Sequence, residues 1–438
     1  MNDPFVLKEN GDKAFAAGDL TLALDYYNQA ITLRPQFFAA CYQKGNVLMQ
    51  LQQYLEASCM FWQSYLFNKT NITAALMAAR ALAQGEYSLE ACNIFDAFST
   101  DQIDNESLIY YIFALRQQGR PSEALPLLPR LDGMNNLLSN WAKAIILIDL
   151  NHVKEAQRIL EPYDDVDLEG HITILLHPVY IFLKKQAAIT SLLDRAIKRI
   201  KAPDYFCCQR IAIDVLSGEN KTPIDAYRSL KRFDIIDAAD YLSKHANKDL
   251  IYTGTTYQTF DVLSQFVAKE GLILEFGVRF GYSISHLAKL FAPRTVFGFD
   301  SFQGLPENWY WEMAGSYTTQ GKIPQLAKNI TLVPGWFNET LPDFKKNHQE
   351  PIAFINIDCD LYSSTKLVLD ELGKQIIPGT VIVFDEYIGN PNWREDEFKA
   401  FQEWVKENRV KYRYLTASFY TKQVAVQIIS KGRKSKNK

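Results

Sequence analysis

The stretch Leu274-Glu275-Phe276-Gly277-Val278-Arg279-Phe280-Gly281-Tyr282-Ser283 decides the fold of the C-terminal half of this chain. An apolar run, residues 272–274, leads into it, and apolar residues at helical spacing follow it, namely Ile284, Leu287, Ala288 and Phe291. This order predicts a strand, a glycine turn and a helix, the first unit of a doubly wound, Rossmann-like sheet. The glycines let the backbone approach a ligand closely, and the amides around Ser283 at the helix N-terminus favour an anion.

The same stretch narrows the choice of nucleotide. A dinucleotide-binding loop would read G-x-G-x-x-G, but here Glu275 takes the first position and only Gly277 and Gly281 remain. A carboxylate there would repel a pyrophosphate, whereas it could accept hydrogen bonds from an ammonium group. A second apolar run, 295–299, ends in Asp300, an acid suited to a ribose diol. S-adenosylmethionine (SAM) fits these features, although the stretch alone leaves open a strand-turn-helix with incidental glycines.

Composition excludes several classes of protein. The chain has 438 residues, 47% of them hydrophobic and 22% charged, which is typical of two or three globular domains. A net charge of −3 gives no sign of nucleic-acid binding. The six cysteines form no C-x-x-C pair and the N-terminus lacks the apolar core of a signal peptide, so we expect reduced thiols and a cytoplasmic protein. The apolar runs are too short for a membrane span.

The N-terminal half contains a repeat. Alanines recur 34, 34, 33 and 32 residues apart, at Ala23, Ala57, Ala91, Ala124 and Ala156. In the first three units an aromatic residue follows four positions later (Tyr27, Phe61, Phe95) and a small residue precedes by twelve (Gly11, Gly45, Ala79). This period predicts paired helices stacked in an α-solenoid, and the pattern resembles the tetratricopeptide repeat family. The resemblance implies a groove for a peptide or protein partner; the alternative is that the helices only pack together.

The predicted architecture is therefore an α-solenoid followed by a Rossmann-like doubly wound α/β domain. We place the helical repeats in residues 1–170 and a helical continuation or connector in 171–245. The α/β domain takes 246–430, and a basic disordered tail takes 431–438.

Acidic residues follow two further strands of the predicted sheet. The apolar run 352–357 leads to Asp358 and Asp360, and the run 380–384 leads to Asp385 and Glu386. The carboxyl ends of neighbouring parallel strands meet at one edge, so these side chains should gather there. Carboxylates held together need protons or a cation, and Mg²⁺ is the metal that suits them best. The alternative is that one or two of them cap helices or pair with Arg and Lys.

Aromatic residues lie near the same edge. Trp336 and Phe337 follow the strand predicted at 330–333 and could wall an adenine ring, or equally belong to the core. The long polar and aromatic segment 307–322 is a candidate lid over a ligand, the alternative being a surface loop whose aromatics cover the sheet.

Taken together, five motifs resemble the macrocin O-methyltransferase family, which methylates sugar hydroxyls with SAM and Mg²⁺. They span about 257–429 and occur in the family's order: the 275–283 loop, Phe299-Asp300-Ser301-Phe302-Gln303-Gly304-Leu305-Pro306, Gly335-Trp336-Phe337, Asp358-Cys359-Asp360-Leu361-Tyr362 and Asp385-Glu386-Tyr387. The resemblance implies a role for each cofactor-binding position. Glu275 and Gly277 would meet the methionine part of SAM, Ser283 its carboxylate, Asp300 the ribose, and Trp336 and Phe337 the adenine. Gly281 and Ser301 would be further cofactor-binding positions. It also implies that Asp358, Asp385 and Glu386 bind the metal.

One position departs from a related pattern. Catechol O-methyltransferases, which the order of loops also resembles, place a lysine base three residues after the first metal-binding aspartate, and here that residue is Leu361. We therefore expect Asp360 to be the general base, beside Asp358, with Tyr362 as the second choice. A metal chelated by two neighbouring hydroxyls would orient the attacking oxygen, which predicts a sugar diol or a catechol as acceptor.

These inferences predict a cytoplasmic, SAM-dependent, divalent-metal-assisted O-methyltransferase acting on a sugar or glycosylated acceptor. Its repeat domain would recruit a partner or substrate, or form a homo-oligomer. Three alternatives stay open. One is an O-methyltransferase of a catechol-like molecule, and another is a tetratricopeptide scaffold with a non-catalytic SAM-binding domain. The third, a nicotinamide-dependent oxidoreductase, is disfavoured by Glu275 and by the missing third glycine.

Overall fold

The computed structural model describes residues 3–134 and 136–432, so all but the first two residues of the predicted basic tail lie outside the described part. The chain separates into two compact units, residues 1–159 and 160–438. Each unit is described by itself. The helices predicted as a connector, between 171 and 245, belong to the second unit.

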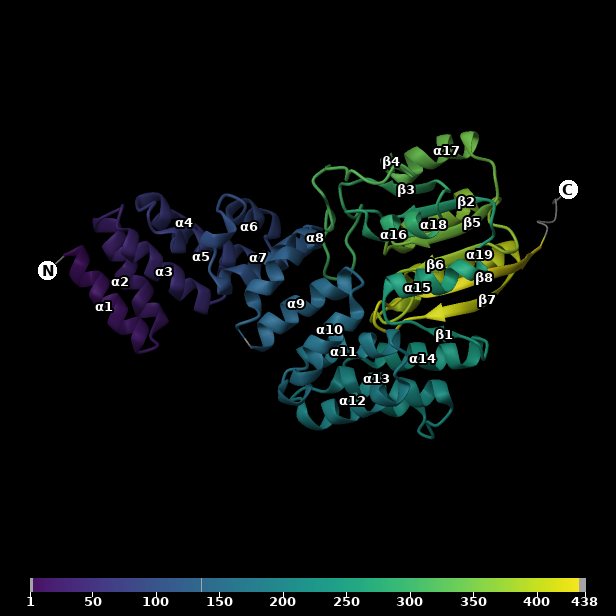
Figure 1. Ribbon diagram of the computed structural model, residues 1–438, viewed down its shortest axis with the longest axis horizontal. Helices are drawn as coiled ribbons and strands as arrows, with labels where there is room; N and C mark the ends of the chain where they lie inside the picture. Colours follow the sequence, from purple (N-terminus) through teal and green to yellow (C-terminus); the bar gives the residue numbers. More distant parts are fainter. Residues whose placement is uncertain (1–2, 135, 433–438) are drawn as a thin grey trace. The chain divides into compact units, whose positions relative to one another are not determined.

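The first unit is built of antiparallel helix pairs (Figure 1). Its α-helices are α1 (Pro4–Ala16), α2 (Leu20–Leu33), α3 (Phe38–Gln50), α4 (Tyr54–Phe67), α5 (Ile72–Gln84), α6 (Ser88–Phe95), α7 (Asn105–Gln117), α8 (Pro121–Ala124), α9 (Leu137–Asp149) and α10 (Val153–Leu160). Short 3₁₀ turns are η1 (Thr100–Gln102), η2 (Leu125–Leu131) and η3 (Glu161–Val166), the last of which belongs to the second unit.

The small and aromatic positions of the repeat pack against each other. A Cβ atom on Gly11 would lie 2.6 Å from Cε1 of Tyr27, and one on Gly45 would lie 2.7 Å from Cε1 of Phe61. Both rings are fully buried. Because glycine at these two positions leaves room for the ring of the second helix, the two helices of each pair can approach closely. The predicted α-solenoid is confirmed.

The repeat that contains Ala124 departs from the regular helix pair because its second helix is short. Ala124 is buried, as the repeat predicts, but its helix α8 has only four residues and passes directly into the 3₁₀ turn η2. Pro126 and Pro129 follow in that turn, and proline lacks the amide hydrogen that an α-helix needs to continue. The second helix of this pair is therefore shortened.

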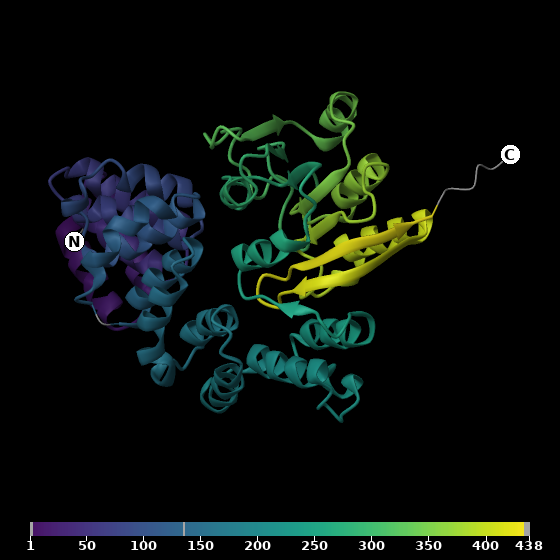
Figure 2. The ribbon, with the colours of Figure 1, turned by 45° about the vertical axis from the view of Figure 1, so that its right-hand side comes forward.

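The second unit begins with helices that pack on one edge of a sheet. They are α11 (His171–Phe182), α12 (Gln186–Arg199), α13 (Asp204–Ser217), η4 (Ile224–Tyr227) and α14 (Phe233–His245). Figures 1 and 2 both show α14 beside strand β1 (Ile251–Tyr252). The Tyr241 hydroxyl lies 3.0 Å from that of Tyr414 in strand β7, and Trp393 Nε1 donates to Asp237 at 3.1 Å. These contacts attach the helices to the sheet.

The sheet has eight strands in the order β1-β7-β8-β6-β5-β2-β3-β4. The other strands are β2 (Leu272–Phe276), β3 (Val296–Asp300), β4 (Ile330–Pro334), β5 (Ile352–Ile357), β6 (Val381–Phe384), β7 (Val410–Ala417) and β8 (Val424–Lys431). All neighbouring pairs are parallel except the two that involve β8. From β2 the chain first moves outward to β3 and β4 and then returns to β5 on the other side. The loops after β2 and β5 therefore diverge, which opens a crevice for a ligand.

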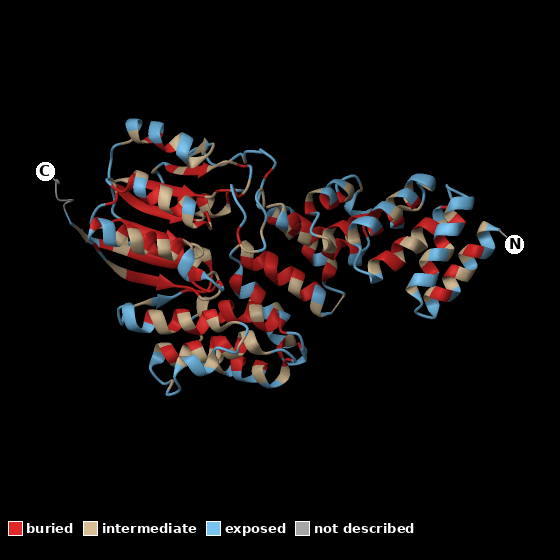
Figure 3. Cartoon of the chain, turned by 180° about the vertical axis from the view of Figure 1, so that it is seen from behind, coloured by how far each residue is buried: buried red, intermediate tan, exposed pale blue. Residues whose placement is uncertain are grey.

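Helices cover both faces of the sheet, as a doubly wound fold requires. They are α15 (Thr256–Leu263), α16 (Tyr282–Leu290), α17 (Phe337–Asn347), α18 (Tyr362–Leu372) and α19 (Glu397–Asn408), with η5 (Ser264–Phe266) and η6 (Trp393–Glu395) between them. Leu274 and Phe276 pack with α14, α17, α18 and α19, whereas Ile273 packs with α15 and α16. Figure 3 shows the strands buried between these layers. The predicted α/β domain is confirmed.

Within residues 3–134 and 136–432, no helix has the length and apolar character needed to cross a membrane.

Candidate active site

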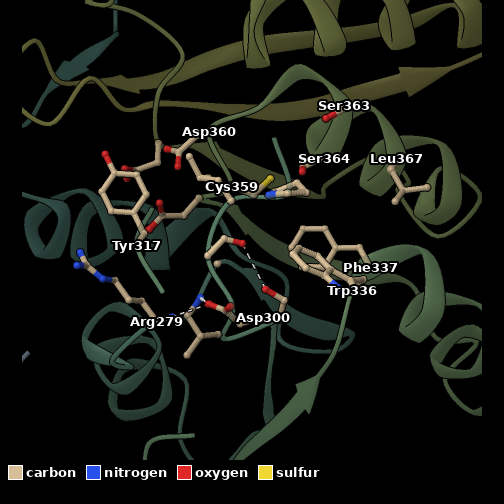
Figure 4. A pocket seen from close by; sticks show the side chains of 18 of the residues that line it. Arg279, Asp300, Tyr317, Trp336, Phe337, Cys359, Asp360, Ser363, Ser364 and Leu367 are labelled. Carbon is tan, nitrogen blue, oxygen red and sulfur yellow. Dashed lines mark hydrogen bonds between the residues drawn. The ribbon is translucent and has the colours of Figure 1, made fainter. Parts of the chain in front are cut away.

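A pocket of about 480 Å³ opens where β2, β3, β5 and β6 end. Most of the predicted site residues line it: Gly277, Asp300, Ser301, Trp336, Phe337, Asp358, Asp360, Asp385 and Glu386. Figure 4 shows Trp336 and Phe337 on one side of Asp300, and Arg279, Tyr317 and Asp360 toward the other. Three predicted cofactor residues, Glu275, Gly281 and Ser283, are not part of its wall.

The glycine loop presses against the end of β5. Gly277 has φ 91°, and a Cβ there would lie 1.7 Å from the carbonyl oxygen of Asp358. The amide of Asp358 in turn donates to the Phe276 carbonyl at 2.8 Å. Gly281, at φ 84°, is the N-cap of α16. Glycine at both positions permits backbone conformations that other residues rarely adopt.

Asp300 fixes the shape of this loop. Its Oδ2 accepts from the amides of Val278 (2.8 Å) and Arg279 (2.7 Å), and its Oδ1 accepts from the amide of Phe302 (2.7 Å). A carboxylate offers about four acceptor positions, so roughly one is left, on Oδ1, for a ligand hydroxyl. The residue predicted to bind ribose thus also orders the glycine loop.

Glu275 and Ser283 bind each other. The Ser283 hydroxyl donates to Oε1 of Glu275 at 2.7 Å, and the Asn356 amide donates to Oε2 at 3.5 Å. Glu275 has no exposed surface, and this burial raises its pKa to about 8. The structure therefore does not place either side chain where a ligand in the pocket would touch it, and their predicted contacts with methionine stay predictions.

The buried carboxyl of Glu275 has a consequence for stability. Its ordinary pKa is 4.5 and its folded pKa about 8, so between these values the unfolded chain releases a proton that the folded chain keeps. Stability should therefore fall as pH rises through this window, by up to about 1.4 kcal/mol per pH unit. Glu275→Gln keeps the shape without the charge and should remove this loss. Urea unfolding of the second unit at about pH 5 and about pH 8 measures it.

The matched control for this measurement is Glu270→Gln, because Glu270 is exposed and precedes the same strand. That variant should unfold with the pH dependence of the wild type. An unchanged pH dependence in Glu275→Gln would contradict the assignment of a protonated Glu275.

The acidic residues after β5 and β6 raise one another's pKa. Burial and the neighbouring Glu386 raise the pKa of Asp360 to about 8 and that of Asp385 to about 7. Burial, Asp385 and Asp360 also raise the pKa of Asp358. These groups come together because β5 and β6 are parallel neighbours whose carboxyl ends lie at one edge.

Hydrogen bonds and one ion pair hold these acidic residues in place. Asp385 accepts a hydrogen bond from the Gln423 amide. Glu386 accepts from Asn390 at 2.6 Å and lies 3.0 Å from the ammonium of Lys422. The Glu386 amide donates to Glu397 at 3.0 Å. Three of these four partners lie on loops beyond β6, so the sequence around the acidic residues does not reveal them.

The two candidate bases differ in position. Asp360 lines the pocket, at φ 61°. The hydroxyl of Tyr362 donates to Glu403 at 2.6 Å, and Tyr362 is not part of the pocket wall. Asp360 is thus the one of the two that a ligand in the pocket would meet.

The predicted lid segment, 307–322, is attached to the sheet domain at several points. Trp309 is buried with Leu305 and Leu361. The Tyr310 hydroxyl donates to Asp396, and the Ser363 hydroxyl donates to Glu307 at 2.5 Å. Beyond these contacts the segment brings Tyr317 to the pocket wall.

Comparison with known proteins agrees with this geometry. A family model described as a methyltransferase domain matches residues 274–387, which run from the glycine loop through the acidic residues after β6. Residues 274–387 form a methyltransferase domain. The boundaries of the match coincide with the strands and loops that build the pocket.

Two curated relatives of this methyltransferase domain are O-methyltransferases. Demethyldecarbamoylnovobiocin O-methyltransferase of Streptomyces niveus is 28% identical over 128 residues, which cover 24% of this chain and 48% of that protein. The 8-demethyl-8-(2,3-dimethoxy-alpha-L-rhamnosyl)-tetracenomycin-C 4'-O-methyltransferase of Streptomyces olivaceus is 36% identical over 62 residues, covering 14% of this chain and 23% of that protein. The chain therefore spans less than half the length of these curated relatives.

A solved tetratricopeptide repeat protein from Parabacteroides merdae is 14% identical, with a TM-score of 0.43. The alignment covers 55% of this chain and 99% of that protein. At these values the likeness adds nothing to the helix packing already seen in the first unit.

The metal prediction for the methyltransferase domain finds no support in the geometry. Among residues 3–134 and 136–432, no group of three or more His, Cys, Asp and Glu side chains is placed so as to hold a metal ion. Of the predicted ligands, Glu386 already has a cation, Lys422, as its partner. The crowding of Asp358 with Asp385 would favour a cation, although among the described residues these two carboxylates belong to no such group of three.

The methyltransferase domain also has pocket residues that sequence reasoning missed. Arg279 lies inside the quoted glycine stretch, and its positive φ of 49° was not readable from sequence. Tyr317 lies in the segment predicted as a lid, where its aromatic ring was the available signal. Ser363 and Ser364, in the first turn of α18, also line the pocket.

Proposed function

We propose that this protein is a SAM-dependent O-methyltransferase. The observation that carries the proposal is a single pocket that joins two chemical surfaces. One is the glycine loop with Asp300, which suits a nucleoside, and the other is the carboxylate group around Asp360, which suits an acceptor hydroxyl. The match of 274–387 to a methyltransferase domain supports the same assignment.

SAM would lie along the pocket in the order of its parts. Asp300, with Ser301 beside it, would hold the ribose, and Trp336 and Phe337 would flank the adenine. The methionine part would then extend over the glycine loop toward Arg279, with the methyl group on the side of Asp360, as the order of side chains in Figure 4 permits.

The reaction requires only two contributions from the protein. The sulfonium of SAM already activates the methyl group, so the protein must place an acceptor oxygen in line with it and remove a proton. As the oxygen attacks, its bond to the methyl carbon forms and the carbon–sulfur bond breaks, leaving S-adenosylhomocysteine. The Asp360 carboxylate would take the hydroxyl proton, and Asp358 beside it would help to orient the acceptor.

The proposed acceptor is a hydroxyl of a sugar or of a glycosylated molecule. The name of one curated relative includes a rhamnosyl group and that of the other a novobiocin skeleton, and both are O-methyltransferases. A catechol-like acceptor is the alternative within the same chemistry. The repeat unit is proposed to recruit a protein or peptide partner or to mediate self-association.

Mg²⁺ stays part of the proposal as a prediction only. Asp358, Asp385 and Glu386 would hold it, and when bound it would polarise an acceptor hydroxyl and lower its pKa. A cytoplasmic location also stays a prediction.

The test is transfer of the labelled methyl group of SAM to a panel of free sugars, glycosylated small molecules and catechols, each with Mg²⁺ and with EDTA. We expect label on a hydroxyl of a sugar-bearing acceptor. Label on catechols alone would show that the acceptor is a catechol and not a sugar. A protein that binds SAM but labels none of the three classes would support the scaffold alternative.

A further inference from the structure

We infer that Arg279 binds the carboxylate of the methionine part of SAM. This inference rests on the proposed function, because it names how one end of the cofactor is recognised in the same pocket. The residue lies in the glycine loop between β2 and α16, and it is a different residue from Ser283, which the sequence pattern assigns to that carboxylate.

The surroundings of Arg279 leave its charge available. The side chain is exposed and lines the pocket. Its guanidinium carbon lies 4.8 Å from the ring centre of Phe280 and 5.3 Å from that of Tyr317. Within the described part of the chain it makes no ion pair, and no Lys or other Arg lines the pocket. The two rings hold the guanidinium plane without using its hydrogen-bond donors.

Several other donors of the loop already have acceptors within the protein. The amides of Val278 and Arg279 donate to Asp300, and that of Gly281 donates to the Val278 carbonyl at 2.8 Å. The Ser283 hydroxyl donates to Glu275. These donors are therefore not available to a ligand carboxylate, whereas the guanidinium of Arg279 is a charged donor that faces the pocket without an ion-pair partner among the described residues.

The charge of the pocket wall favours such a cation. The pocket wall carries Asp300, Asp358 and Asp360, as well as Asp385 and Glu386. A ligand carboxylate entering among these groups would be repelled unless a positive charge faced it. Arg also offers a planar fork that matches both oxygens of a carboxylate.

The backbone conformation of Arg279 also supports a ligand-binding role. Its φ of 49° is rare for a residue other than glycine, and Tyr317, its stacking partner, has φ 66°. A glycine at 279 would remove the strain but also the charge. Residues with such rarely populated backbone conformations cluster at functional sites.

The position of Arg279 also fits the length of the cofactor. In Figure 4 the side chains run from Trp336 and Phe337 through Asp300 to Arg279. This is the order of adenine, ribose and methionine in SAM. The methionine carboxylate, at the end opposite the adenine, would thus reach the guanidinium.

The test is calorimetric titration of the full-length protein with SAM and with decarboxylated SAM, which lacks only the carboxylate. Arg279→Met keeps an unbranched apolar chain and the same backbone constraint. We expect it to weaken SAM binding by about 10- to 100-fold, the loss typical of one charge-assisted pair, and to leave the affinity for decarboxylated SAM unchanged. Arg279→Lys should recover part of the loss. Lys289→Met, which removes an exposed charge from α16, should bind both ligands like the wild type.

Two results would overturn the inference. One is equal weakening of both ligands, which would show that Arg279 only shapes the loop. The other is unchanged SAM affinity with a raised KM for the acceptor, which would assign the guanidinium to an anionic acceptor. Failure of the proposed function would look different, because the wild-type protein would then bind neither SAM nor its decarboxylated form.

Discussion

Asp360→Asn is expected to lower kcat for methyl transfer by about 10²- to 10⁴-fold, the usual contribution of a general base. The asparagine keeps the size and the polar contacts of the side chain but cannot take the hydroxyl proton. SAM affinity should change much less than kcat, because the proposal places Asp360 beside the acceptor hydroxyl, and Figure 4 shows it away from Trp336 and Phe337. Steady-state kinetics with labelled SAM, together with a SAM titration, separate the two effects.

Tyr362→Phe is the matched control for that experiment. Its hydroxyl is bound to Glu403 and it is not part of the pocket wall, so its loss should leave kcat unchanged. A large loss of kcat in Tyr362→Phe together with a mild effect of Asp360→Asn would reverse the assignment of the base.

Gly277→Ala is expected to abolish productive SAM binding. The added Cβ would lie 1.7 Å from the Asp358 carbonyl oxygen, which is backbone and cannot swing aside. The loop and the end of β5 would have to separate, and a displacement of about 1 Å at an active site can cost on the order of 10²-fold in rate. We expect at least that loss in kcat/KM, with folded protein by circular dichroism.

Gly379→Ala separates this clash from the cost of a positive φ. Gly379 has φ 99°, close to the 91° of Gly277, and a Cβ there would meet nothing within 4 Å. It should cost about 1–2 kcal/mol of stability, the usual penalty of the left-handed region, and leave SAM binding intact. Equal effects of the two substitutions on binding would argue against the close approach of the loop to Asp358.

Much of the fold could be predicted because its signals are local. Strand β2 follows from the apolar run that leads to Glu275. The two glycines predict the turn, and the apolar spacing after them predicts helix α16. In the first unit, the contact of Gly45 with Phe61 is encoded by a spacing of 16 residues that recurs along the chain. Such patterns are readable because each residue's partner lies on the same or the next element.

The candidate site was harder to predict because its partners are distant in sequence. Asp300 binds the amides of Val278 and Arg279, more than 20 residues earlier. Lys422 pairs with Glu386 from 36 residues away. Ser283 turned to Glu275 rather than to the pocket, since a buried carboxyl needs a donor. Spacing alone gives the strand ends, but the sheet determines which side chains meet there.

The most direct test of the account is calorimetric titration of SAM into the wild-type protein and into Asp300→Ala, each checked for folding by circular dichroism. Asp300 both orders the glycine loop and is proposed to hold the ribose. The account predicts a single-site binding heat for the wild type and its loss in Asp300→Ala. A folded wild-type protein that takes up no SAM, or an Asp300→Ala variant that binds it equally well, would contradict the account.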